Sequence, residues 1–100
     1  MYQLRIYTLD SEQSADLYFE KVWKNHLDSL PKFGIKPLSV FRVQGKPQVV
    51  AIVDYGDNDP VQAEKAYMQS PDILQDFEGI VPITAVVSTE TPLLHEADYI

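Results

Sequence analysis

The first strand is predicted from the strict alternation of side chains over residues 2 to 9. One set consists of Tyr2, Leu4, Ile6 and Thr8, and the other consists of Gln3, Arg5, Tyr7 and Leu9. Successive side chains of a strand point to opposite faces, so the two sets lie on opposite sides of the sheet. We expect Leu4 and Ile6 to face the helices and Arg5 to lie on the other face.

An amphipathic helix is predicted from about residue 11 to about residue 30, because apolar residues recur there at steps of three and four. Its apolar stripe consists of Ala15, Phe19, Val22, Trp23, His26, Leu27 and Leu30. Asp10 has the spacing of a capping box, Ser11 offers a second N-cap, and Pro31 closes the helix. We expect the ring of Trp23 to be buried between this helix and the sheet.

A hairpin follows the first helix. Residues 35 to 43 and residues 48 to 55 are two runs rich in β-branched and aromatic side chains. The connection over residues 44 to 47 is short enough for an antiparallel hairpin. The pattern therefore predicts the second and third strands.

A helix with one break is predicted after the hairpin. Asp59 and Ser70 each stand directly before a proline, which is typical of an N-cap followed by the first helical position. The first signal predicts a helix over about residues 60 to 69, and the second predicts a short helix through Phe77. Residues 83 to 89 have the composition of a fourth strand.

The order β-α-β-β-α-β is typical of an α+β ferredoxin-like sandwich, in which helices cover one face of a four-stranded antiparallel sheet. The later strands are apolar on both faces, through Val40, Val43, Val49, Val50, Ala51, Ile52, Val53, Val86 and Val87. A second sheet should cover the free face, so we expect a homodimer. Residues 91 to 100 should lie extended over a surface of this chain or of its partner.

Size and charge narrow the function classes. One hundred residues make a single domain over residues 1 to 100, and a net charge of −7 disfavours nucleic acid and anionic membranes as partners. The chain has no cysteine, which excludes disulfides, thiolate metal sites and a cysteine nucleophile. No run approaches the ~18 apolar residues of a membrane span, and we expect a cytoplasmic protein.

Arg5 is the most informative polar residue, because a permanent cation on a central strand needs a carboxylate or an anionic ligand. One interpretation is a cavity in which Arg5 orients an acid or enolate-like oxygen and Tyr7 donates a hydrogen bond. The other interpretation is a structural ion pair with an acidic group such as Glu90 or Asp54.

His26 is the second candidate for chemistry, with Trp23 one turn earlier as an apolar wall. It could shuttle a proton, or it could be a hydrogen-bonded residue at the edge of the core. The helix that carries it should pack behind the sheet, away from the face of Arg5. Arg5, Tyr7 and His26 are therefore the candidate catalytic residues, and Arg5 ranks above His26.

Metal and nucleotide chemistry have little support in the sequence. His26 and His95 are the only imidazoles, and neither has another ligand at a suitable spacing. The glycines are isolated, and no serine occupies a nucleophile elbow. We expect no metal and no cofactor.

Several short motifs together resemble the NIPSNAP family over nearly the whole chain. They are Tyr2-Gln-Leu-Arg5-Ile-Tyr7-Thr-Leu9, Trp23-x-x-His26, Gly34-Ile35, Gln48-Val-Val, Tyr55 with its acidic turn, Pro71 with Phe77, and Ser88-Thr-Glu90 with Leu93-Leu94. The resemblance implies a dimeric α+β barrel, in which two ferredoxin-like protomers join their bare sheet faces and enclose a small cavity in each half. Relatives often carry a His where this chain has Ala51, and a Trp where it has Ile73 and Leu74, so those roles do not carry over.

Two classes of function remain open. The first is a site for a small acidic or aromatic molecule in the barrel, lined by Arg5, Tyr7, Phe41 and Tyr55. Such a site could serve binding alone, or a cofactor-free monooxygenase or isomerase acting on that compound, by analogy with the fold. The second class is a non-enzymatic assembly module. A haem-handling protein is a further alternative, for which His26 would have to be the axial ligand.

Overall fold

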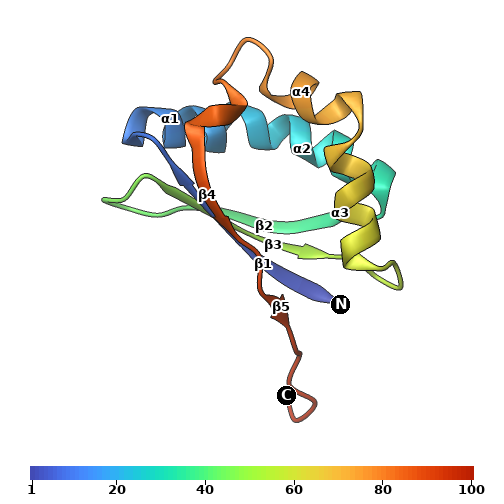
Figure 1. The fold of residues 1–100 in the computed structure, drawn as a ribbon. Helices are drawn as coiled ribbons and strands as arrows, with labels where there is room; N and C mark the ends of the chain where they lie inside the picture. Colours follow the sequence, from blue (N-terminus) through green and yellow to red (C-terminus); the bar gives the residue numbers. More distant parts are fainter.

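An antiparallel sheet forms the base of the fold, and the helices all lie on one side of it (Figure 1). The computed structural model describes residues 1–100. The strands are β1 (Tyr2–Leu9), β2 (Lys36–Arg42), β3 (Gln48–Asp54), β4 (Val86–Glu90) and β5 (Leu93–Leu94). Their order is β2-β3-β1-β4, and β5 also pairs with β1. This is the ferredoxin-like arrangement, so the predicted α+β class is confirmed.

The helical layer is built from segments that begin and end close to the predicted positions. They are α1 (Glu12–Leu17), a π-helical turn (Tyr18–Val22), α2 (Trp23–Ser29), a 3-10 turn (Leu30–Phe33), α3 (Pro60–Met68) and α4 (Pro71–Phe77). Ser11, rather than Asp10, caps α1, and its hydroxyl accepts a hydrogen bond from the Ser14 amide. Asp59 caps α3 by accepting from the Val61 amide.

The buried stripe of the first helical segment differs from the prediction at its edges. Tyr18 and Ser29 are buried, whereas Leu27 is 51% exposed. The stripe is centred on Val22 and His26, and successive residues of an α-helix are about 100° apart. Leu27 therefore falls outside the stripe. Trp23 is only 2% exposed, as predicted.

The structure reverses the predicted faces of β1. Gln3, Arg5, Tyr7 and Leu9 are its buried residues. Arg5 contacts Glu64 on α3, and the ring of Tyr7 lies 6.1 Å from that of Trp23 on α2, so this face is the one under the helices. The prediction was wrong because both sets of side chains contain apolar residues, and alternation alone cannot say which set the helices cover.

The C-terminal part of the chain also completes the sheet. A 3-10 turn over Ile83–Ala85 precedes β4, which is therefore shorter at its start than predicted. Leu93 and Leu94 then pair with Gln3 and Tyr2 of β1, so the tail begins on the chain's own sheet. None of the helices has the length and apolar character needed to cross a membrane.

Candidate functional site

A cavity of about 220 Å³ lies between the sheet and the helical layer. Its lining residues come from β1, the π-helical turn, α2, α3, α4, the 3-10 turn before β4 and β4 itself. They are Arg5, Tyr7, Tyr18, His26, Glu64, Tyr67, Met68, Ile73, Phe77, Ile83, Val86 and Thr89. At ~30 Å³ per water, this volume equals roughly seven water molecules. The space suits a ligand smaller than a typical drug molecule.

Arg5 occupies the sheet side of this cavity. Its Nη2 donates to both carboxylate oxygens of Glu64, at 2.7 and 2.6 Å. The Arg5 side chain is only 3% exposed, and two of its nitrogens, Nε and Nη1, have no hydrogen-bond acceptor in the protein. Burying a donor without an acceptor costs free energy, and neither atom has surface that a water molecule can reach in this structure. A ligand oxygen would therefore accept from these N–H groups only after the side chains packed over them move.

The charge states around Arg5 follow from burial. Burial by itself would lower the pKa of Arg5, but its interactions with neighbouring groups, including the hydrogen-bonded carboxylate of Glu64, raise that pKa above its usual value. Burial raises the pKa of Tyr7, and it raises the pKa of Tyr18 well above the usual value for tyrosine. The guanidinium is therefore charged at neutral pH, and the two phenols are protonated.

A second polar cluster lies on the helix side of the cavity and centres on Asp76 of α4. Its Oδ2 lies 2.8 Å from Nδ1 of His26, and it accepts hydrogen bonds from the hydroxyls of Ser29 at 2.5 Å and Tyr67 at 2.8 Å. We name these four residues, Ser29, His26, Tyr67 and Asp76, the Asp76 cluster. It joins α2, α3 and α4 through buried polar contacts.

The Asp76 cluster fixes the orientation of the His26 ring. Burial by itself would raise the pKa of Asp76, but the hydrogen bonds from His26, Ser29 and Tyr67 outweigh it and hold the pKa below its usual value. Asp76 is therefore an ionised acceptor at neutral pH, and Nδ1 of His26 must be the donor. In the neutral ring, Nε2 is then the nitrogen without a hydrogen, and its hydrogen-bond neighbour is Tyr18 Oη at 3.5 Å.

Aromatic rings connect the two polar ends of the cavity. The guanidinium carbon of Arg5 lies 5.9 Å from the centre of the Tyr7 ring. The Tyr7 and Tyr18 rings are 5.2 Å apart, and the Tyr18 and His26 rings are 5.9 Å apart. Arg5 and His26 thus line one small space together with the rings of Tyr7 and Tyr18.

The structure brings together three of the predicted site residues and separates the other two. Arg5, Tyr7 and His26 line the same cavity, so the expectation that His26 lies in a layer away from Arg5 was wrong. This expectation failed because the structure reverses the predicted faces of β1. Phe41 is 55% exposed on the open face of the sheet. Tyr55 is buried but does not line the cavity, and its hydroxyl donates to Gln3 Oε1 at 2.7 Å.

The acidic partners of the site were missed by the sequence analysis. Arg5 pairs with Glu64 rather than with Glu90 or Asp54. Glu64 follows Ala63, a buried residue of α3, and Asp76 lies between the buried Ile73 and Phe77 in α4. An acidic residue within the apolar stripe of a short helix was the available signal.

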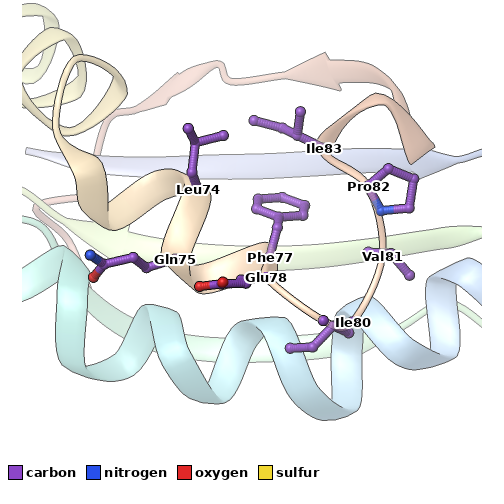
Figure 2. Close-up of a pocket in the computed structure, with 9 residues that line it drawn as sticks. Leu74, Gln75, Phe77, Glu78, Ile80, Val81, Pro82 and Ile83 are labelled. Atoms are coloured by element: carbon purple, nitrogen blue, oxygen red, sulfur yellow. The ribbon is translucent and has the colours of Figure 1, made fainter.

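A wider apolar hollow of about 620 Å³ borders the cavity on its outer side. Figure 2 shows Phe77 projecting from α4 toward Leu74 and Ile83 at this hollow. Phe77 and Ile83 line both spaces, so they form the wall between the cavity and the outside. No group of His, Asp and Glu side chains in the chain is arranged to hold a metal ion.

Comparisons with known proteins agree with this architecture. A crystal structure of an Agrobacterium tumefaciens protein superposes with a TM-score of 0.73 at 16% identity, covering 98% of this chain and 94% of that one. An uncharacterized NIPSNAP domain protein from Burkholderia xenovorans superposes with a TM-score of 0.65 at 11% identity, covering 99% and 96%. No curated protein sequence matches the chain. The NIPSNAP family profile matches residues 2–99, and the chain therefore belongs to the NIPSNAP family.

Proposed function

We propose that this NIPSNAP protein binds a small acidic, aromatic molecule in the cavity beside Arg5. The observation that carries the proposal is the pair of buried donors on Arg5, Nε and Nη1, which have no acceptor in the protein. Buried polar groups are nearly always hydrogen-bonded, so an occupant whose oxygen displaces the side chains packed over these donors would complete this site. A carboxylate, phenolate or enolate oxygen matches a charged guanidinium best.

The rest of the cavity favours an aromatic body for this ligand. Tyr7, Tyr18 and Phe77 offer ring surfaces, while Ile73 and Val86 add aliphatic ones. Aromatic rings pack against one another in tilted and edge-to-face geometries, which the existing wall already shows, with 58° between Tyr7 and Tyr18. A ligand with one ring and one acidic group fits both the chemistry and the volume.

Substitution of Arg5 by Met tests this proposal, since Met keeps much of the stem volume and deletes every donor. Small aromatic acids such as benzoate, phenylacetate and phenylpyruvate should raise the Tm of the wild type. At a concentration of 100 times Kd, a ligand raises the free energy of unfolding by about 2.7 kcal/mol. Arg5→Met should lose this shift. Differential scanning fluorimetry measures both proteins over a ligand series.

Arg42→Met is the matched control for Arg5→Met. Arg42 lies on β2 and pairs with Asp16, so its loss should leave the ligand shift intact. If Arg5 serves only as the structural partner of Glu64, Arg5→Met should lower the Tm without ligand and keep the full ligand shift. That pattern would contradict the proposal.

We also propose that a second copy of the chain covers the open face of the sheet. Leu4, Ile6, Val50 and Ile52 lie on this face in register across β1 and β3, and Phe41 of β2 is their exposed neighbour. Such an apolar face is unusual for a monomer, and a stable dimer would bury on the order of 1,500 to 2,500 Å² in total. The cavity beside Arg5 lies between the sheet and the helices, on the other side of the sheet from this open face.

Phe41→Asp should convert this dimer into a monomer, because it places a charge at an apolar contact. Light scattering at micromolar concentration measures the mass of both forms. Leu27→Asp is the control, since Leu27 is similarly exposed but lies on α2, on the opposite side of the protein. A monomeric wild type would contradict the proposed dimer.

A further inference from the structure

We propose that His26 is a general base that removes a proton from a carbon atom beside a carbonyl group. The cavity would then interconvert the keto and enol forms of a small aromatic 2-oxo acid. This inference rests on the proposed ligand class, and it adds a reaction to it. Phenylpyruvate, which has one ring, one carboxylate and an acidic CH2 group, represents the substrate class.

The base is prepared by the Asp76 cluster. Nδ1 of His26 is held at 2.8 Å from the Asp76 carboxylate, so the ring is oriented and its Nε2 is the proton acceptor. An adjacent carboxylate also stabilises the imidazolium that forms when Nε2 takes a proton. Asp76 already accepts from Ser29 and Tyr67, so the position of the carboxylate does not depend on His26 alone.

The surroundings of the ring suit proton transfer to a bound ligand. The Trp23 ring lies 4.8 Å from the His26 ring at 89°, and the Phe77 ring lies 6.0 Å away at 69°. These apolar edges limit the access of water, and His26 is only 4% exposed. Its contact with Tyr18 Oη is long, at 3.5 Å, so a ligand can compete for Nε2.

Arg5 supplies the complementary group for the oxygen of the substrate. Its charged guanidinium belongs to a residue that lines the cavity, so it attracts an oxygen that becomes negative during the reaction. Its Nε and Nη1 have no acceptor, and they would donate to that oxygen once the side chains packed over them move. Stabilisation of a developing oxyanion by fixed donors in a dry site is a major contribution to catalysis. Arg5 and His26 line the same cavity of about 220 Å³, and the proposal requires one small molecule to contact both.

The step needs no oxidant, metal or second substrate. The C–H bond beside the carbonyl breaks, and its proton goes to Nε2 of His26. The electron pair of that bond forms a carbon–carbon double bond, while the π pair of the carbonyl moves to its oxygen, which Arg5 holds. Return of a proton from the imidazolium to that oxygen gives the enol, and return to carbon restores the ketone.

Hydrogen exchange in D2O tests this reaction. Wild-type protein is mixed with phenylpyruvate, and proton NMR follows the loss of the benzylic CH2 signal. We expect exchange well above the buffer rate, with one of the two benzylic hydrogens replaced before the other. Such selectivity is expected of a ring fixed on one side of the ligand, and dissolved imidazole does not show it.

His26→Asn is the decisive variant, because the Asn amide can replace Nδ1 toward Asp76 while no atom replaces Nε2. The exchange rate should fall by about 100-fold or more, whereas phenylpyruvate should still raise the Tm. His95→Asn is the matched control, because His95 is exposed in the C-terminal tail. This variant should catalyse the exchange of the benzylic hydrogens at the wild-type rate.

The outcomes separate the two proposals. If phenylpyruvate raises the Tm but the wild type exchanges no faster than buffer, the ligand site stands and the general base is wrong. Equal rates in the wild type and His26→Asn would also overturn the general base. If none of the aromatic acids shifts the Tm of the wild type, the proposed ligand site itself is wrong. The wild-type measurement decides the question even if His26→Asn does not fold.

Discussion

Asp76→Asn should destabilise the protein by about 3 to 5 kcal/mol, because it removes the charged acceptor of a buried cluster. Three donors from two other helices converge on this carboxylate, and Asp76 itself is 5% exposed. The amide keeps the shape but carries no charge, so the three donors that converge on Oδ2 would face a weaker acceptor. For a domain of this size, the Tm should fall by roughly 12 °C or more. Thermal unfolding followed by circular dichroism measures it.

The effect of Asp76 should also depend on pH. Hydrogen bonds hold the pKa of Asp76 in the folded protein below its usual value, which is about 3.9 in an unfolded chain. The stability that this group contributes is therefore complete above about pH 4 and is lost as the pH falls through the folded pKa. The difference in stability between the wild type and Asp76→Asn should shrink in acid.

Asp72→Asn is the control for Asp76→Asn on the same helix. Asp72 pairs with the exposed Lys32 at 2.9 Å, and exposed ion pairs contribute little to stability. Its substitution should change the free energy of unfolding far less. Equal losses in the two variants would show that the charge of α4, rather than the buried cluster, is what stabilises the fold.

Trp23→Ala should cost about 3 to 5 kcal/mol, because it removes the largest fully buried side chain and leaves a hole between α2 and the sheet. The indole packs edge-on against the His26 and Tyr7 rings, so the same change loosens the wall of the cavity. Chemical denaturation measures the loss. Trp23 is the only tryptophan in the chain, and its emission should be blue-shifted.

Trp23→Phe is the informative companion to Trp23→Ala. The indole Nε1 is buried without a hydrogen-bond acceptor, so Phe removes an unsatisfied donor and keeps most of the ring contact. Its cost should be much smaller than that of Trp23→Ala. In the wild type, an emission maximum typical of a water-exposed indole would show that the Trp23 ring is not buried in solution.

Local sequence patterns were sufficient to predict the order of the elements. Proline after a cap residue predicted the starts of α3 and α4, at Pro60 and Pro71. Alternation predicted β1, and the apolar spacing placed Trp23 in the core. These predictions succeeded because caps, turns and periodicity are properties of residues close together in the chain. The motifs that resemble the NIPSNAP family also predicted the ferredoxin-like fold.

The face of β1 that lies under the helices was decided by the tertiary structure alone. Alternation separated Arg5 and Tyr7 from Leu4 and Ile6, but both sets can be buried, and only the packing of α2 and α3 shows which one is covered. That packing put Arg5 and His26 in one cavity, although the sequence indicated separate layers for them.

The acidic partners of Arg5 and His26 likewise could not be predicted from the sequence. Glu64 is 59 positions from Arg5, and Asp76 is 50 positions from His26. No local pattern encodes such pairings, because they arise only when helices that are distant in the chain close over the sheet. The sequence by itself therefore determined the elements, their order and the apolar character of the sheet. The fold alone determined which charges meet, because a buried cation or carboxylate is stabilised by whichever partner the packing brings within hydrogen-bonding distance.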